Sequence, residues 1–415
     1  MNQISILGLG YVGLPSAAVF ADAGMKVVGV DINAKSVETI NSGRAHIVEP
    51  GLDELLNKVV GNGSLRATTA AEPSDVFVIA VPTPFKDGNA PDLAYVKSAA
   101  GMIAPLIEKG NLVILESTSP VGATEQLAGW IRDARPDLKV PELDGEEGDI
   151  YLAYCPERIL PGKVIQEVVE NDRVIGGVTA ESSIKAVAFY KNAIKGTCHI
   201  TNARTAELCK LSENSFRDVN IAFANELSMI SAKLGVDVYE LITLTNHHPR
   251  VNILQPGTGV GGHCIAVDPW FIVDSAPDEA RIIRMAREVN DSKPGWVIEQ
   301  VTKLAERQVQ PVIACMGLAY KPDVDDLRES PSIEAVKLLV DKAIGKVVVC
   351  EPFVDALPES LNNIGIDLLN VEQVCDKADI IVFLTAHSQF RNIPAHQLQN
   401  KTIFDACGLT KWRNA

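Results

Sequence analysis

Aromatic residues are scarce in this sequence and make up only 5% of its 415 residues. Because 47% of the residues are nevertheless hydrophobic, the core must consist mostly of Ala, Val, Ile and Leu. Such small aliphatic residues suit parallel strands that are covered on both faces by helices. At roughly 150 residues per domain, the length predicts about two to three domains.

Basic side chains are also few, since 38 Lys and Arg stand against 53 Asp and Glu and leave a net charge of −15. A protein that binds nucleic acid by neutralising phosphates normally carries the opposite sign, so no nucleic-acid partner is expected. This balance still allows local basic pockets for a small phosphorylated ligand.

The chain contains no apolar run of 18 residues, and residues 1–10 show no basic flank before a long apolar segment. We therefore expect neither a membrane span nor a secretion signal. The eight cysteines are scattered without a Cys-x-x-Cys pair, as is typical of reduced thiols in the cytoplasm. These absences predict a cytoplasmic protein that does not act at a membrane.

Strands alternate with helical patterns at both ends of the chain, which predicts doubly wound parallel sheets. The expected strands are 4–7, 27–30, 74–81 and 112–115 in the first part, and 312–316, 346–350, 378–384 and 401–404 in the last. The turn Gly317-Leu318-Ala319-Tyr320 echoes Gly8-Leu9-Gly10-Tyr11 with fewer glycines. We interpret the second sheet as a relative of the first that no longer suits a dinucleotide pyrophosphate.

Between the two sheets we expect long helices, from about Thr201 to Leu234 and from about Asp278 to Glu306. Helices of this length exceed the usual globular range and suit a connector or a dimer interface. The predicted fold class is α/β, with two Rossmann-like doubly wound parallel sheets joined by a central helical connector. The expected domains are residues 1–200, 201–308 and 309–415.

The segment from Gly8 to Gly13 matches G-x-G-x-x-G and lies between a predicted strand and a predicted helix. In this motif Gly8 makes a tight turn, Gly10 lets the backbone approach a pyrophosphate, and Gly13 permits close packing of helix and strand. The helix N-terminus adds amide donors and a positive dipole for the phosphates. Asp31 ends the next strand, where it would bind both ribose hydroxyls and repel a 2′-phosphate. The motif therefore predicts NAD rather than NADP, with turns at Thr83 and Thr118 on the same edge of the sheet.

A glycine-rich segment leads to Cys264, with Asp268 four residues further on. Its backbone can wrap closely around a ligand, and a thiolate beside an oxidised nicotinamide can trap an aldehyde as a thiohemiacetal and then a thioester. A lone cysteine is more often a packing residue. A His263–Cys264 dyad is disfavoured because sequence neighbours usually point apart, and no metal is predicted. The spacing matches no common zinc site for the four candidate ligands His247, His248, His263 and Cys264.

Lys210, Asn214 and Arg217 follow one another at i, i+4 and i+7 and therefore share one helix face. An amine, an amide and a guanidinium in a line could stabilise an oxyanion and handle protons. The alternative is a solvated stripe in which Glu213 forms an ordinary ion pair with Arg217.

In the second sheet, Lys321 and Arg328 follow the first strand, where they could reach a ligand or pair with acidic neighbours. Ser330 is the expected N-cap of the next helix, with Pro331 at its first position.

Seven motifs, in the same order over essentially the whole chain, resemble the UDP-glucose/GDP-mannose dehydrogenase family. They are G-L-G-Y-V-G-L-P at 8–15, V-P-T-P at 81–84, S-T-S-P-V-G at 117–122, P-E-R at 156–158, K-L-S-E-N-S-F-R-D at 210–218, G-G-H-C at 261–264 and D-D-L-R-E-S at 325–330. The resemblance implies that the primary alcohol of a nucleotide-linked sugar is oxidised to a carboxylate while two NAD are reduced. It also implies that the first domain binds NAD, the second forms a homodimer and the third binds a UDP-sugar.

By the same resemblance, Cys264 is the nucleophile, Lys210 stabilises the oxyanion and handles protons, and Asn214 donates a hydrogen bond. Asp268, with Thr118 and Glu157, would position or activate water. The residues that match NAD contacts are Gly8, Gly10, Tyr11, Val12, Gly13, Asp31, Thr83, Thr118 and Arg328. The residues that match sugar-nucleotide contacts are Arg158, Ile159, Lys210, Asn214, Arg217, His248, Arg250, Gly261 and Lys321, of which Arg250 is expected to reach a neighbouring subunit's site.

Within the family, the sequence around Cys264 is similar to that of members acting on UDP-N-acetyl-D-mannosamine in bacterial surface-polysaccharide synthesis, such as that of enterobacterial common antigen. Val267 stands where UDP-glucose enzymes have a lysine. The chain departs from the pattern at Ser36, where many relatives have an arginine, and at Thr258, where a proline is expected.

Three alternatives stay open at this point. The first is a UDP-glucose or UDP-N-acetylglucosamine 6-dehydrogenase with the same mechanism. The second is a two-electron hydroxyacid dehydrogenase in which Lys210 is the base and Cys264 is idle. The third is an NAD-binding sensor without turnover.

Overall fold

The computed structural model describes residues 3–141, 148–159, 162–262 and 264–410. The chain divides into two compact units. The first unit is Met1–Glu213 with Trp270–Ala276, and the second is Asn214–Pro269 with Pro277–Ala415. Within the described ranges, no helix is both long and apolar enough to cross a membrane.

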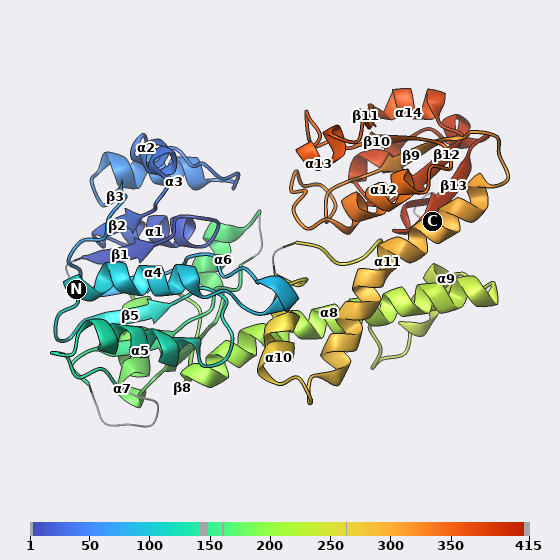
Figure 1. Ribbon diagram of the computed structural model, residues 1–415. Coiled ribbons are helices and arrows are strands. Elements are labelled where there is room, and N and C mark those ends of the chain that lie inside the picture. The colour runs from blue at the N-terminus through green and yellow to red at the C-terminus, as the bar shows by residue number, and fades with distance from the viewer. Residues whose placement is uncertain (1–2, 142–147, 160–161, 263, 411–415) are drawn as a thin grey trace. The chain divides into compact units, whose positions relative to one another are not determined.

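The first unit is built on an eight-stranded sheet with the order β3-β2-β1-β4-β5-β6-β7-β8 (Figure 1). The six strands from β3 to β6 have the order of a dinucleotide-binding fold, in which ligands bind beyond the carboxyl ends of the strands. The strands are β1 (Ile4–Leu7), β2 (Val27–Val30), β3 (Leu65–Thr68), β4 (Val76–Ile79), β5 (Leu112–Leu115), β6 (Tyr151–Tyr154), β7 (Arg173–Gly177) and β8 (Cys198–Asn202).

This sheet departs from the predicted parallel arrangement at one place. Neighbouring strands pair in parallel, except that β7 runs antiparallel to β6, with Ala153 opposite Gly177. A connection of this kind needs only the short helix α6 (Val164–Glu170) between the two strands rather than a full crossover. The sequence pattern also missed β3, β6, β7 and β8, of which β3 and β8 are partly exposed.

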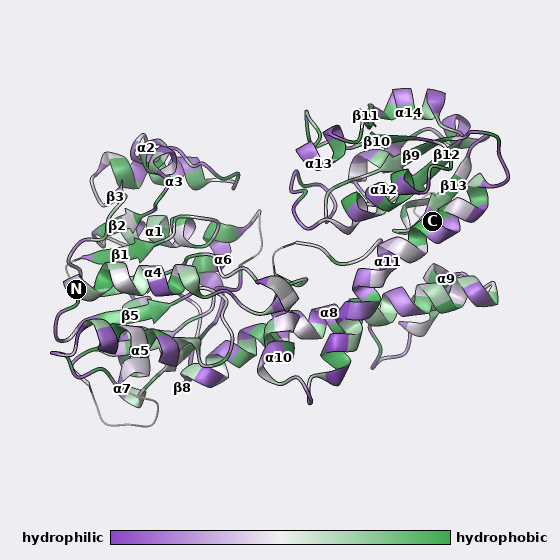
Figure 2. Cartoon of the chain, in the orientation of Figure 1, coloured by the Kyte–Doolittle hydropathy of each residue, from purple (hydrophilic) through white to green (hydrophobic). Residues whose placement is uncertain are grey.

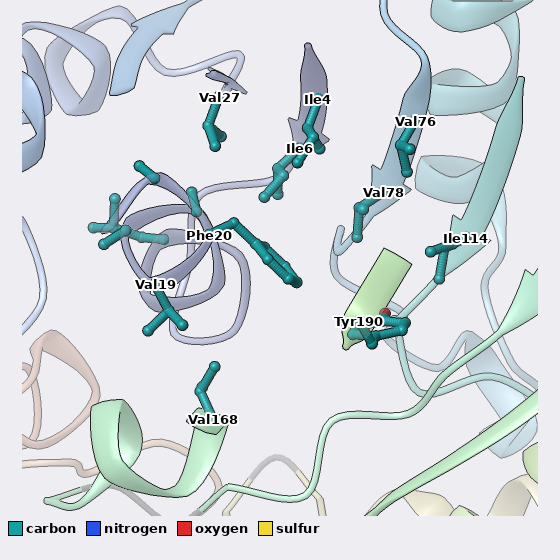
Figure 3. Packing of buried hydrophobic residues seen from close by; sticks show 14 of the residues in the cluster. Ile4, Ile6, Val19, Phe20, Val27, Val76, Val78, Ile114, Val168 and Tyr190 are labelled. Carbon is teal, nitrogen blue, oxygen red and sulfur yellow. The ribbon is translucent and has the colours of Figure 1, made fainter. Parts of the chain in front are cut away.

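Helices cover both faces of this sheet. α1 (Gly13–Asp22), α2 (Ala34–Asn41), α3 (Leu52–Gly61), α6 and α7 (Ala180–Tyr190) pack on one face. α4 (Ala94–Ile103) and α5 (Ala123–Ala134) pack on the other. Figure 3 shows Phe20 of α1 pointing between the strand residues Ile6 and Val78 and the ring of Tyr190, whose centroid lies 6.0 Å away.

The helical region between the sheets consists of α8 (Ala203–Leu234), α9 (Val238–Thr245), α10 (Asp268–Ser275) and α11 (Arg281–Ala305). The two long helices confirm the expected connector, and α8 alone has 32 residues. Figure 2 shows α8 and α11 alternating between hydrophilic and hydrophobic segments, whereas the strands are largely hydrophobic.

The second unit contains a five-stranded, fully parallel sheet with the order β11-β10-β9-β12-β13. Its helices α12 (Pro331–Asp341) and α13 (Glu359–Asn362) lie on the face that also contacts α11, and α14 (Val371–Lys377) lies on the other. Ser330 caps α12 and Pro331 is its first residue, as predicted. The strands are β9 (Val312–Met316), β10 (Lys346–Cys350), β11 (Asp367–Leu368), β12 (Ile380–Phe383) and β13 (Thr402–Asp405).

The two sheets share more than their strand order. In the first, Leu7 lies opposite Val30 and the Gly8 amide donates to Val30 O at 2.8 Å. In the second, Met316 lies opposite Cys350 and the Gly317 amide donates to Cys350 O, also at 2.8 Å. Gly8 and Gly317 both have a φ of 90°. The structure therefore supports the duplication that the two similar turns indicate.

Candidate active site

The turn between β1 and α1 contains three glycines with different constraints. A Cβ on Gly8 would lie 2.5 Å from Ala80 O, and one on Gly13 would lie 1.9 Å from Gly8 O, so the packing of the chain itself requires both. A Cβ on Gly10 would meet nothing within 4 Å. The space beside Gly10 is therefore open to a ligand, as a pyrophosphate requires.

The N-terminus of α1 is also suited to an anion. Its N-cap residue Val12 makes no side-chain capping hydrogen bond, and the first turn of the helix contains no acidic residue. The amides of this turn and the helix dipole can thus bind phosphate. Tyr11 is 42% exposed beside them. These features fit NAD.

Asp31 lies directly beyond β2, and each of its carboxylate oxygens accepts one backbone hydrogen bond. Leu9 N donates to Oδ2 at 3.0 Å, and Asn33 N donates to Oδ1 at 2.9 Å. These bonds orient the carboxylate while leaving each oxygen capacity for a ribose hydroxyl. Ser36 is buried in α2, where its amide helps to cap the helix through Asn33.

The turns after β4 and β5 are joined to each other. Thr83 Oγ1 donates to Thr118 O at 2.5 Å, and Ser117 Oγ donates to Val81 O at 2.7 Å. The structure thus brings Thr83 and Thr118 together at the same edge of the sheet as the glycine turn.

Glu157 lies in a buried polar cluster beyond β6. Its Oε2 accepts from Arg173 Nη1 at 2.5 Å, and its Oε1 accepts from Arg158 N at 2.7 Å. Both carboxylate oxygens therefore hold the backbone and β7 in place. Glu157 is also only 6% exposed, and this burial favours a positioning role over the direct contact with water that the resemblance implies.

The same cluster contains Glu116 at the end of β5, which is 2% exposed. Tyr190 Oη donates to Glu116 Oε1 at 2.6 Å, and the Arg173 guanidinium lies 5.6 Å from the centre of the Tyr190 ring. Burial raises the pKa of Glu116 to about 7, although the charge of Arg173 opposes this effect.

Arg158 corrects one expectation about the long helix. Glu213 pairs with Arg158, whose Nη1 donates to Glu213 Oε1 at 2.8 Å, rather than with Arg217 one turn further on. Arg158 also donates to Asp172 O. The residue after it, Ile159, is half-buried. The alternative of a solvated Glu213–Arg217 pair is thus wrong for Glu213.

Residues 257–268, here named the cysteine loop, carry the proposed nucleophile in the second unit. Cys264 is exposed, and its carbonyl oxygen accepts the amides of Val267 at 3.0 Å and Asp268 at 2.8 Å. The Asp268 carboxylate, which is 2% exposed, accepts from Asn214 Nδ2 at 2.5 Å. The thiol and the carboxylate therefore lie on one turn, and Asn214 of α8 holds the carboxylate.

Close packing explains two of the glycines in the cysteine loop. A Cβ on Gly261 would lie 2.2 Å from Glu329 O, and one on Gly262 would lie 2.9 Å from the Tyr320 ring. Thr258 Oγ1 donates to Leu384 O at 2.8 Å, a bond that the proline expected at this position could not make. The loop is thus held against the first turn of the second sheet. His263 lies outside the described residues.

The first turn of the second sheet, Gly317–Tyr320, lacks the open space for a ligand that lies beside Gly10 in the corresponding turn of the first sheet. Glu351, which occupies the position of Asp31, accepts both Leu318 N at 2.6 Å and Ala319 N at 3.0 Å with Oε2. The extra methylene of glutamate lets the protein's own carboxylate take amides that would otherwise face an anion. His387 Nε2 lies 3.0 Å from Glu351 Oε2, and its Nδ1 accepts from Asp323 N.

The remaining expected residues have varied surroundings. Arg328 donates two hydrogen bonds of 2.8 Å to Asp326, in agreement with the alternative that it pairs with an acidic neighbour. Lys321 Nζ lies 5.8 Å from the centre of the Tyr320 ring. His248 and Arg250 are exposed beyond α9. Lys210 and Arg217 lie on α8 with the predicted spacing. Among the residues that the structure describes, no group of three His, Cys, Asp or Glu could hold a metal ion.

Several buried polar residues of the structure lie outside the sequence motifs. Arg173, Tyr190, Glu116 and Glu351 carry no local motif, because each acts through partners far away in sequence. The one signal available was the correspondence of Glu351 with Asp31 at the end of the second strand of each sheet.

A dinucleotide-binding edge of a sheet and an exposed thiol beside a hydrogen-bonded carboxylate are typical of an NAD-dependent oxidoreductase. Comparison with known proteins identifies the family to which this chain belongs. Residues 2–194 match the NAD binding domain of the UDP-glucose/GDP-mannose dehydrogenase family, 204–292 its central domain and 314–411 its UDP binding domain. The chain therefore belongs to the UDP-glucose/GDP-mannose dehydrogenase family and is an NAD-dependent UDP-sugar dehydrogenase.

Individual relatives cover nearly the whole chain. An NDP-N-acetyl-D-galactosaminuronic acid dehydrogenase of Ralstonia nicotianae is 57% identical over 98% of this chain and 96% of its own. A UDP-N-acetyl-D-mannosamine dehydrogenase of Yersinia pestis is 54% identical over 99% of both chains. The solved UDP-D-ManNAc dehydrogenase of Pyrococcus horikoshii is 38% identical, with a TM-score of 0.88 over 98% of this chain and 96% of its own.

Replacing Glu116 by Gln should change how stability depends on pH. The folded protein keeps this proton up to about pH 7, whereas the unfolded chain releases it near the ordinary pKa of 4.5. The contribution of Glu116 to stability should therefore fall as the pH rises from 4.5 to 7, by up to about 3 kcal/mol. In urea unfolding between pH 5 and 8, the free energy of unfolding of Glu116→Gln should lack this decrease. Glu38→Gln, a change at an exposed site, should retain it. Identical pH profiles for wild type and Glu116→Gln would contradict the assignment.

Proposed function

We propose that this protein oxidises the 6-hydroxyl of UDP-N-acetyl-D-mannosamine to UDP-N-acetyl-D-mannosaminuronic acid, with Cys264 as the nucleophile. The observation that carries the proposal is the turn on which the exposed thiol of Cys264 precedes the carboxylate of Asp268, itself bound by Asn214. An accessible thiol can hold an aldehyde, and a bound carboxylate close to it can orient water.

Bound NAD supplies the hydride acceptor, one molecule for each two-electron oxidation. The glycine turn, with Tyr11, Val12, Asp31, Thr83 and Thr118, would hold the first such molecule, and Arg328 would contact it after leaving Asp326. The chain's remaining task is to retain the aldehyde between the two oxidations.

In the proposed reaction, Cys264 Sγ attacks C6 of the aldehyde and forms a thiohemiacetal. The second oxidation converts this adduct to a thioester. Water then attacks C6, the C–S bond breaks, and the thiol and the carboxylate are released. Overall, one alcohol, two NAD and one water give one carboxylate, two NADH and three protons.

The other roles follow the family pattern together with the contacts described above. Lys210 would stabilise the oxyanion and move protons, and Asn214 would orient Asp268, which with Thr118 positions water. We assign Glu157 to support of the turn that carries Arg158. The residues proposed to bind the sugar nucleotide are Arg158, Ile159, Lys210, Asn214, Arg217, His248, Arg250, Gly261 and Lys321.

Two relatives of nearly equal identity support an N-acetylated sugar. One is named for N-acetyl-D-mannosamine and one for N-acetyl-D-galactosaminuronic acid. Oxidation of the corresponding UDP-N-acetylgalactosamine is therefore the second candidate, with the same residues and mechanism. We further propose that the uronic acid enters a bacterial surface polysaccharide.

We also propose a cytoplasmic homodimer formed through the central helices. The eight cysteines all lie among the described residues and form no disulfide there, as is typical of a reducing compartment. On α8, Phe216, Phe223 and Ile230 follow one another at intervals of seven residues and are 72%, 52% and 45% exposed. An apolar stripe of this kind on one helix face is suited to a second copy of the same helix.

The yield of NADH tests the mechanism. Complete oxidation should give two NADH per sugar consumed, and Cys264→Ala should form no acid because the aldehyde is no longer retained. Cys198→Ala, which alters a half-buried cysteine, is the control and should behave as wild type. A yield of one NADH, or full turnover by Cys264→Ala, would refute the covalent route and favour a two-electron dehydrogenase.

A panel of UDP-sugars tests the substrate. We expect kcat/KM for UDP-N-acetylmannosamine to exceed those for the UDP derivatives of N-acetylglucosamine, N-acetylgalactosamine and glucose at least tenfold. Such a ratio corresponds to about 1.4 kcal/mol of transition-state discrimination. The highest value for N-acetylgalactosamine would instead support the second candidate. No NADH from any sugar would point to a sensor without turnover.

Sedimentation velocity tests the dimer. Phe223→Glu places a charge within the apolar stripe and should shift the protein from dimer towards monomer. Val309→Glu, at a residue that is 96% exposed, is the control and should leave the dimer intact. A wild-type monomer, or an unchanged dimer in Phe223→Glu, would exclude this interface.

A further inference from the structure

A chain of buried polar side chains connects α8, α11 and the cysteine loop within the second unit. It begins at Asp218 of α8, which is fully buried. Asp218 Oδ1 accepts from Arg287 Nη1 at 2.7 Å and from Asn290 Nδ2 at 2.8 Å, both on α11. Because a carboxylate can only accept, it determines which end of the Asn290 amide faces it.

The orientation is passed on to the cysteine loop. Asn290 Oδ1 accepts from Asn225 Nδ2 at 2.9 Å, which leaves Asn225 Oδ1 to accept from Gly257 N, also at 2.9 Å. Asn225 and Asn290 are 0% and 1% exposed. The Gly257 amide, at the start of the cysteine loop, is thus held by a series of hydrogen bonds in which each side-chain amide donates to the residue before it and accepts from the residue after it.

The cysteine loop also packs directly on Asn290, a member of this series of hydrogen-bonded side chains. A Cβ on Gly259 would lie 3.2 Å from Asn290 O and 2.8 Å from the Cβ of Pro331. Thr258 Oγ1 holds the other side through Leu384 O. The beginning of the loop therefore has little freedom to shift while Asn225 keeps its orientation.

We propose that Asp218, Asn290 and Asn225 are positioning residues for Cys264 and that they act through the Gly257 amide. This inference rests on the proposed role of Cys264 as the nucleophile. If these hydrogen bonds served only to join α8 to α11, their loss would lower the free energy of unfolding but would leave the reactivity of the Cys264 thiol unchanged.

Asn225→Asp tests the direction of the chain. The new carboxylate still accepts from Gly257 N but turns an oxygen towards Asn290 Oδ1, and Asn290 cannot turn over because Asp218 holds its donor. We expect kcat with NAD and the UDP-sugar to fall at least tenfold, with KM for NAD changed less than twofold. The rate at which iodoacetamide alkylates Cys264, followed by mass spectrometry of its peptide, should change at least threefold. Asn220→Asp, the same change at a less buried position of α8, is the control and should change neither rate.

Asn225→Ala supplies a second comparison, because it removes the acceptor of Gly257 N without placing a charge beside Asn290 Oδ1. It leaves the buried pair of Asp218 with Arg287 intact. This variant should also lower kcat and change the alkylation rate, and it takes the place of Asn225→Asp should that variant fail to fold.

A wild-type alkylation rate in both Asn225→Asp and Asn225→Ala would overturn the proposal. Alkylation needs no turnover, so this outcome is separate from a failure of the proposed function. Full activity of Cys264→Ala would refute the nucleophile but would leave the positioning of the loop measurable.

Discussion

The parallel pairing of the first strand of each sheet with both of its neighbours is the constraint on which the rest of the structure depends. β1 pairs with β2 and β4, and β9 pairs with β10 and β12. Parallel pairing brings the carboxyl ends of these strands to one edge, so residues from distant parts of the chain meet there. Asp31, Thr83 and Thr118 come together beside the glycine turn for this reason.

The same geometry has opposite consequences in the two sheets. Asp31 takes one amide of its glycine turn, and the space beside Gly10 stays open. Glu351 is longer by one methylene and takes two amides of the corresponding turn. The two sheets thus share their strand pairing. In the second sheet, however, the Glu351 carboxylate occupies the position beside the turn that a phosphate would take. The cysteine loop packs on this filled turn, which gives it a rigid support close to Tyr320 and Glu329.

Buried charge is concentrated where the backbone must be held in place. Arg173 with Glu157 and Arg287 with Asp218 are both almost fully buried ion pairs. A buried ion pair gains little net stability, but it orients its neighbours strongly because each unpaired partner would be costly. In this protein the neighbours are the turn that carries Arg158 and the amides that lead to the cysteine loop.

The sequence by itself determined the fold class, the cofactor, the family and the principal candidate residues. Strand and helix periods are local, and the glycine, cysteine and lysine motifs carry their chemistry within a few residues. Only the tertiary structure decided the antiparallel β7, the pairing of Glu213 with Arg158, the filled turn at Glu351 and the chain from Asp218 to Gly257. Each of these depends on partners separated by tens of residues, and a side chain's hydrogen-bond partner follows from packing rather than from its own position in the sequence.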